Sequence, residues 1–197
     1  MLKIGITGGI GSGKSTVCKV FEQLNIPLFN ADSEAKKLLS SILVKDFYRK
    51  EFGNQVFIGE EIDKNKLSAL IFNNKEALTK VNAFIHPMVF DVFENWCLGN
   101  SASPYVIKEA ALLFESQAYK NLDYTLLVTA PVEQRIERVL SRDSSTVADI
   151  NARMDKQMTD AEKEKLADFV IHNDGKSLLV PILLEIHNNL INRKKIR

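Results

Sequence analysis

The sequence has few cysteines, almost no net charge and no long apolar run. Only Cys18 and Cys97 are cysteines among 197 residues, so a disulfide framework is excluded and reduced, buried thiols are expected. The 26 Lys and Arg nearly balance the 25 Asp and Glu, and a formal net charge of +1 offers no general attraction to nucleic acid or membranes. No run is long enough for a membrane span, and the N-terminus lacks the regions of a signal peptide. We therefore expect a cytoplasmic protein with neither nucleic acid nor membrane as a partner.

The chain is long enough for one main domain with a small insertion. Hydrophobic residues make up 45% of its 197 residues, which is enough to bury one substantial core. We expect a monomer, although composition leaves the oligomeric state open. The basic tail at residues 192–197 is short, so we interpret it as a frayed end and not as a nucleic-acid arm.

A glycine-rich segment near the N-terminus matches the phosphate-loop pattern G-x-x-x-x-G-K-[ST] in full. It reads GGIGSGKS over residues 8–15, between a strand predicted over residues 2–6 and a helix predicted over residues 16–24. Glycines let the backbone N–H groups point at a phosphate, and the helix adds the positive end of its dipole. The alternative, a turn that binds nothing, is disfavoured because the pattern is complete and correctly placed.

This loop predicts a site for ATP with Mg²⁺. Lys14 can reach the β and γ phosphates and so takes part in catalysis, while the Ser15 hydroxyl can bind the metal ion. The nucleotide contacts predicted from the loop and the start of its helix are Gly8, Gly9, Gly11, Ser12, Gly13, Lys14, Ser15 and Thr16.

Short apolar runs predict the remaining strands of an α/β fold. They lie at residues 28–29, 105–107, 126–128 and 169–171, with helical patterns between them. Such strands predict a five-stranded parallel sheet with helices on both faces, in the manner of a P-loop kinase.

Two segments stand apart from this sheet pattern. Residues 33–100 have helical spacing without a strong strand, and such a helical insertion is where a kinase builds its acceptor site. Residues 140–165 are polar and predict a short helical lid that excludes water from a reactive phosphate. The predicted nucleotide-binding core consists of residues 1–32, 101–139 and 166–197.

Local patterns also predict several helix boundaries. The two lid helices are expected around residues 150–158 and 161–167, and another helix is expected to start within residues 110–116. Pro87 is expected to be the first residue of a helix over residues 88–98, because proline fits the first helical position. The adjacent His86 is, by local pattern, more typical of capping or packing than of catalysis.

Carboxylates follow two of the predicted strands. Asp32 comes after residues 28–29, and Glu109 comes after residues 105–107. Because the carboxyl ends of parallel strands share one crevice, we expect both acids near the phosphate loop. Asp32 is a candidate base, although capping of a helix that starts at Ser33 explains it equally well locally. Glu109 is a candidate for holding a Mg²⁺-bound water or orienting the acceptor, and its alternative is a solvated strand end.

A basic helix is predicted over residues 133–142. Among its arginines, Arg138 and Arg142 lie on one face, one turn apart, whereas Arg135 precedes them. Guanidinium groups beside a triphosphate stabilise the charge on the transferred group, so Arg138 and Arg142 are catalytic candidates. The alternative is an exposed basic face.

Taken in order, these motifs resemble the dephospho-coenzyme A kinase family over nearly the whole chain. The opening GITGGIGSGKST at residues 5–16 is close to the family's start, and Asp32 matches the second aspartate of its D-A-D motif. The sequence LLFE at residues 112–115 resembles the family's P-L-L-F-E. Further matches are Leu67, Phe72, Leu78, Asn82, His86, Pro87, Gln134, Arg138, Arg142, Asp143, Gln157, Ala167, Asp168 and Asn173.

The resemblance implies the final step of coenzyme A synthesis, in which the γ-phosphoryl group of ATP moves to the ribose 3′-hydroxyl of dephospho-CoA. It also implies adenine contacts near Asn173 to Gly175, a base at Asp32, and acceptor contacts from the helical insertion that include His86. Glu109 is added as an acceptor contact because of its place after a strand. The small-molecule substrate is therefore dephospho-CoA.

The sequence departs from the family pattern at a few positions. Asn30 replaces the first aspartate of D-A-D, which weakens any role of residue 30 in metal binding. Lys64 stands where arginine is common, and Glu109 with Ala111 replaces the usual D-x-P.

Other functions are compatible with a phosphate loop. A nucleoside monophosphate or shikimate-type kinase shares the loop, the lid and the arginines, and differs in its acceptor. A GTPase switch needs N-K-x-D after a strand, but the nearest match, NKEA at residues 74–77, lacks the aspartate. A nucleotide-binding protein without turnover is disfavoured by Asp32 and the basic helix.

Overall fold

A computed structural model describes residues 1–192, except for the side chains of residues 72 and 73. The resemblance at Phe72 and the tail predicted over residues 192–197 thus lie outside the described residues, apart from Asn192. The chain forms two compact units, which we describe separately. The sheet unit contains residues 1–30 and those from 97 onward, and the helical unit is Ala31–Trp96.

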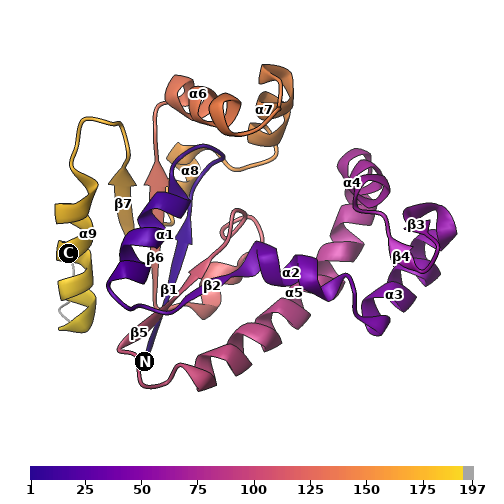
Figure 1. Cartoon of the computed structure of the whole chain (residues 1–197), viewed down its shortest axis with the longest axis horizontal. Helices are drawn as coiled ribbons and strands as arrows, with labels where there is room; N and C mark the ends of the chain where they lie inside the picture. Colours follow the sequence, from indigo (N-terminus) through magenta and orange to yellow (C-terminus); the bar gives the residue numbers. More distant parts are fainter. Residues whose placement is uncertain (193–197) are drawn as a thin grey trace. The chain divides into compact units, whose positions relative to one another are not determined.

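Five parallel strands form the centre of the sheet unit, in the order β2-β5-β1-β6-β7 (Figure 1). They are β1 (Leu2–Thr7), β2 (Leu28–Asn30), β5 (Tyr105–Glu109), β6 (Tyr124–Thr129) and β7 (Phe169–His172). The predicted five-stranded parallel sheet is confirmed. Because the chain leaves β1 toward β2 and later returns on the side of β6, the strand order reverses beside β1, where such sheets bind ligands.

The core of the sheet unit lies between the sheet and two helices, α1 (Lys14–Gln23) and α9 (Leu179–Ile191). Alternate strand residues point into it, as the period of two requires. Each large apolar side chain buried there stabilises the fold by about 1.5–3 kcal/mol. The strand residues in this core are Ile4, Ile6, Tyr105, Ile107, Leu126, Val128 and Ile171.

The opposite face of the sheet is also covered. A Cβ at Gly5 would lie 2.6 Å from side-chain atoms of both Leu113 and Leu122, so residues 110–122 pack directly on β1. The helix α8 (Asp160–Glu164) packs against β6. Helices therefore flank both faces, as predicted.

The segment after β5 differs from its prediction. The helix expected to start within residues 110–116 is wrong: the segment forms hydrogen-bonded turns, followed by the short 3-10 helix η2 (Ala118–Asn121). Leu113 and Phe114 are buried whereas Leu112 is 44% exposed. The turns allow Leu113 and Phe114, which are adjacent in the sequence, to be buried together. In a regular helix, adjacent side chains point in different directions and do not share one buried face.

Three helices lie between β6 and β7: α6 (Val132–Arg142), α7 (Val147–Met154) and α8. The helix predicted over residues 133–142 is confirmed by α6. The boundaries predicted for the next two helices are wrong, since α7 starts earlier and α8 is shorter. Thr146 and Thr159 each form a capping box with the acid three residues later, and these caps fix where α7 and α8 begin.

The helical unit contains four helices and a very short hairpin. The helices are α2 (Ala31–Leu38), α3 (Ile42–Phe52), α4 (Lys64–Asn73) and α5 (Lys75–Gly99), the last of which ends in the sheet unit. After the 3-10 helix η1 (Gly53–Val56), strands β3 (Phe57–Ile58) and β4 (Glu61–Ile62) pair antiparallel around Gly59. No strong strand was predicted there, because two-residue strands show no periodic pattern.

Pro87 lies inside α5 and does not begin a helix, so that prediction is wrong. Buried residues recur every four positions on both sides of it, and this continuous apolar stripe outweighs the hydrogen bond that proline removes. The stripe consists of Ala77, Val81, Ile85, Val89, Phe93 and Cys97. Among the described residues, no helix is long and apolar enough to cross a membrane.

Candidate active site

The phosphate loop runs from the end of β1 to the start of α1. Gly11 and Gly13 adopt φ values of 77° and 97°, which favour glycine, and Gly13 is the N-terminal cap of α1. Thr16 donates the first backbone bond of the helix, to Gly13 O at 3.0 Å. The N–H groups at the start of α1 therefore point out of its positive end. Lys14 Nζ donates to Gly8 O at 2.9 Å, so its ammonium group lies across the loop.

Three glycines of the loop are needed because neighbouring residues approach closely. A Cβ at Gly9 would lie 2.1 Å from Nη2 of Arg135, and one at Gly11 would lie 2.4 Å from the carbonyl oxygen of Arg135. A Cβ at Gly13 would lie 2.1 Å from Nδ2 of Asn173. The loop backbone is thus held in contact with α6 and with the end of β7. Side chains at these three positions would collide with Arg135 and Asn173.

Arg138 and Asn173, two of the predicted site residues, both lie at the loop. Asn173 Nδ2 donates to Ser12 O at 2.8 Å. Arg138 donates through Nη2 to Asn173 O at 3.1 Å and through Nη1 to Gly11 O at 3.5 Å. The Ser12 hydroxyl is buried without a hydrogen-bond partner among the described residues. A cation, an amide and an unsatisfied hydroxyl thus gather at a loop whose shape suits a polyphosphate.

Gln134 connects the same arginine to the segment where adenine contacts are expected. Its Oε1 accepts a hydrogen bond from Arg138 Nη2 at 3.1 Å, and its Nε2 donates to Asp174 O at 2.8 Å. Gly175 follows with a φ of 76°, which permits the turn after β7.

Arg142 is not brought to the loop. Its guanidinium forms two hydrogen bonds with Asp143, at 2.9 Å and 2.8 Å, and its side chain is 62% exposed. These hydrogen bonds lower the pKa of the Asp143 carboxyl and raise that of the Arg142 guanidinium. One of the two predicted catalytic arginines therefore lies at the loop and the other pairs with its neighbour.

Sequence reasoning gave no role to Arg135 and Gln157, which both bind the loop tip. Arg135 Nε donates to Ile10 O at 2.9 Å, and Gln157 Oε1 accepts from Ile10 N–H at 3.1 Å. Arg135 Nη1 also pairs with Asp160 at 3.2 Å. The spacing of Arg135 and Val139 was a signal for this contact. They lie four residues apart, so Arg135 is on the same face of α6 as an apolar residue, and both are buried.

Glu109 lies at the carboxyl edge of the sheet, opposite Asn30 in the strand register. Asn30 Nδ2 donates to Glu109 Oε2 at 2.8 Å. An aspartate at residue 30 would face this carboxylate and repel it, so the asparagine and the glutamate suit each other. The two departures from the family pattern are therefore structurally coupled.

The remaining predicted residues lie on helices. Asp32 is in the first turn of α2, which begins at Ala31 immediately after β2, so Asp32 does not cap a helix starting at Ser33. His86 is an exposed residue of α5 in the helical unit. Ser15 is exposed in the first turn of α1, where its hydroxyl is accessible.

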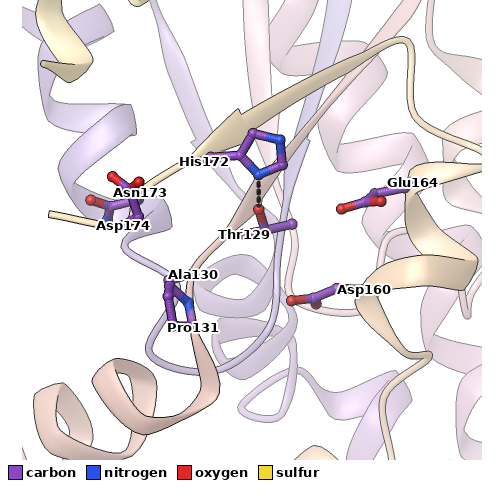
Figure 2. A pocket seen from close by; sticks show the side chains of 8 residues that line it. All are labelled: Thr129, Ala130, Pro131, Asp160, Glu164, His172, Asn173 and Asp174. Atoms are coloured by element: carbon purple, nitrogen blue, oxygen red, sulfur yellow. Dashed lines mark hydrogen bonds between the residues drawn. The ribbon is translucent and has the colours of Figure 1, made fainter. Parts of the chain in front are cut away.

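A pocket of about 330 Å³ opens at the carboxyl ends of β6 and β7. Figure 2 shows the His172 ring turned toward Thr129, to which it is bonded at 2.9 Å, with Asp160 and Glu164 of α8 across from them. Acids on this side make the pocket unsuitable for phosphates, in contrast to the loop. Its lining residues are Thr129, Ala130, Pro131, Asp160, Glu164, His172, Asn173 and Asp174.

The loop and the side chains around it suit a nucleotide, and sequence comparison identifies the family. The family model for dephospho-CoA kinase matches residues 2–178. The chain belongs to the dephospho-CoA kinase family. A dephospho-CoA kinase of Bacteroides fragilis is 38% identical over 189 residues, which cover 94% of this chain and 91% of that protein.

Two solved structures have a fold similar to that of this chain, and one of them is a dephospho-CoA kinase. The crystal structure of TT1252 from Thermus thermophilus has a TM-score of 0.85 and 31% identity, and covers 99% of this chain and 98% of that one. Dephospho-CoA kinase from Campylobacter jejuni has a TM-score of 0.69 and 27% identity, and covers 97% and 98% of the two chains. The chain is accordingly a phosphotransferase that acts on an alcohol, and another type of P-loop kinase is not favoured.

Proposed function

We propose that this chain transfers the γ-phosphoryl group of ATP to the ribose 3′-hydroxyl of dephospho-CoA, giving coenzyme A and ADP. The observation that supports this most directly is the loop itself, where Lys14 lies across the cradle and Arg138 and Asn173 bind its backbone. Positioning and electrostatic stabilisation supply most of the catalysis in phosphoryl transfer, so these groups suit the reaction.

The loop residues and Arg138 are assigned to the nucleotide. Lys14 and the backbone N–H groups hold the β and γ phosphates, and the Ser15 hydroxyl with phosphate oxygens holds Mg²⁺, an ion that prefers such oxygen ligands. Arg138 stabilises charge on the transferred group. The adenine ring is placed against Asn173 and Gly175, beside the Gln134 contact to Asp174.

The acceptor side is assigned to three residues. Asp32 orients the ribose hydroxyl and accepts its proton, and His86 and Glu109 contribute to acceptor binding. Arg142 is assigned to the lid over residues 140–165. Its guanidinium reaches the phosphates only after its hydrogen bonds with Asp143 are broken. We place the enzyme in the cytoplasm, as a monomer.

The test is a coupled assay for ADP release with purified protein, Mg²⁺ and ATP. ADP release is expected to depend on dephospho-CoA, and the product should have the mass of coenzyme A. Shikimate and nucleoside monophosphates serve as control acceptors. Release that required one of these compounds and ignored dephospho-CoA would refute the proposal.

A further inference from the structure

Arg135 is a buried cation that the proposed reaction does not use. It is only 5% exposed, although it is a charged residue in the first turn of α6. Burial of a guanidinium is unfavourable unless carboxylates and carbonyls satisfy its donors. Its partners therefore indicate what the fold gains from keeping it there.

Those partners lie at the tip of the phosphate loop. Nε donates to Ile10 O at 2.9 Å, and Nη2 lies where only a glycine at residue 9 leaves room. The main-chain carbonyl of Arg135 is equally close to Gly11, where a Cβ would lie 2.4 Å away. Residues 9–11 thus rest on both the side chain and the backbone of Arg135.

The loop tip is held from a second direction by the chain leading into α8. Gln157 Oε1 accepts from Ile10 N–H at 3.1 Å, and Asp160 Oδ2 lies 3.2 Å from Arg135 Nη1. Arg135 therefore binds the carbonyl of Ile10, and Gln157 binds its N–H. Arg135 is also paired with Asp160, which lies close to Gln157 in the chain.

The segment containing Gln157 and Asp160 is itself fixed. Lys163 is completely buried, with Nζ 3.0 Å from Glu115 Oε1. The same oxygen accepts from Met158 N–H at 2.9 Å. Lys163 Nζ has no hydrogen-bond partner among the described residues, so Glu115 holds this segment by charge pairing with Lys163 and by the hydrogen bond from Met158 N–H.

We propose that Arg135 is a positioning residue for phosphoryl transfer. By binding Ile10 to the fixed segment at Asp160, it keeps the phosphate loop in the shape that receives the nucleotide. Without Arg135, the loop becomes ordered only when the nucleotide binds. The entropic cost of this ordering lowers the affinity for the nucleotide. Arg135 acts through Ile10 and does not touch the nucleotide; the inference rests on the proposed nucleotide site.

The test compares full-length Arg135→Leu with wild type by ADP calorimetry and by hydrogen exchange of the peptide covering residues 8–13. ADP affinity should fall about tenfold, the scale of one lost charge-assisted hydrogen bond, and the loop peptide should exchange faster. Arg135→Lys can still donate to one acceptor, so its ADP affinity should fall less than that of Arg135→Leu. The control Lys120→Leu removes an exposed lysine whose side chain donates to Gln117, three residues earlier, and should match wild type in both measurements.

A double-mutant cycle with Gly9→Ala distinguishes positioning from a general loss of stability. Gly9→Ala displaces the guanidinium in the wild-type background, so it should weaken ADP binding more there than in the Arg135→Leu background. If Arg135→Leu does not fold, Asp160→Ala removes the ion pair alone and should shift ADP affinity and loop exchange in the same direction.

ADP affinity and loop exchange equal to wild type in these variants, with a lowered Tm as the only effect, would overturn the positioning role. A wild-type protein that bound no ADP would overturn the nucleotide site on which it rests. The two failures are distinguishable, because the second appears before any substitution is made.

Discussion

The two units use polar side chains differently. In the sheet unit, buried or half-buried side chains bind the backbone of distant segments, as Arg135 binds Ile10 and Asn173 binds Ser12. In the helical unit, Arg49 pairs with Glu60 although the Glu60 side chain is 86% exposed. Pairs so exposed contribute little, about 0.2–1 kcal/mol each.

The helical unit is held mainly by apolar and aromatic packing. The rings of Phe47 and Phe84 stack with centroids 3.9 Å apart, and Val44, Tyr48 and Phe93 are buried. The comparison teaches that polar substitutions should affect the loop of the sheet unit strongly and the surface of the helical unit weakly. Four substitutions test that difference.

Lys14→Met should have the largest effect. It removes the ammonium group that we assign to the β and γ phosphates, and kcat/KM should fall about a thousandfold, the upper scale for loss of one stabilising donor. The coupled ADP assay measures this fall. Lys19→Met, at an exposed position of the same helix, serves as the control and should retain wild-type activity. Activity of Lys14→Met within tenfold of wild type would contradict the assignment.

Lys163→Met should lower the free energy of unfolding by about 3 kcal/mol, because it leaves Glu115 unpaired in a largely buried position. Urea denaturation measures the loss. The double variant Lys163→Met/Glu115→Gln removes the charge on both sides and should recover part of the stability. Equal stability of wild type and the single variant would show that the buried pair does not stabilise this segment.

Asp32→Asn should be the strongest substitution in the helical unit. If Asp32 accepts the hydroxyl proton, kcat should fall about a hundredfold while ADP affinity is unchanged. Steady-state kinetics and calorimetry separate the two quantities. Unchanged turnover would remove Asp32 from the mechanism.

Glu60→Gln should have the smallest effect. It breaks the exposed pair with Arg49, so the free energy of unfolding should change by about 0.5 kcal/mol or less. Urea denaturation under the conditions used for Lys163→Met measures it. A loss as large as that of Lys163→Met would contradict the difference between the two units.

The sheet and the phosphate loop were predictable because their patterns are local. Each strand is a short apolar run, and the loop pattern has a mechanical reason for every glycine. The helix start predicted at Pro87 was wrong because it rested on that one residue. The packing of the buried stripe along α5, which keeps the helix continuous, is seen only in the folded structure. The starts of α7 and α8 were missed although their capping boxes are written in the sequence, at Thr146 and Thr159.

The arginines show where sequence reasoning stops. Spacing placed Arg138 and Arg142 on one face, but the side chain of Arg142 turns to Asp143 and the loop is bound by Arg135 and Arg138. Contacts of this kind depend on how α6 is set against residues more than a hundred positions away, which no local pattern encodes. The role of Asp32 was predicted from its place after a strand and from the family resemblance, and that of His86 from the resemblance; both remain predictions.

Both cysteines are buried, and this has a chemical consequence for a protein of this family. Burial, followed by the nearby Glu109, raises the pKa of the Cys18 thiol well above its ordinary value, and Cys97 is only 3% exposed. The proposed substrate and product each end in a thiol that can form mixed disulfides with an accessible thiolate. Because the native fold exposes neither cysteine as a thiolate, the enzyme resists covalent trapping by the compounds it handles when its surroundings become oxidising.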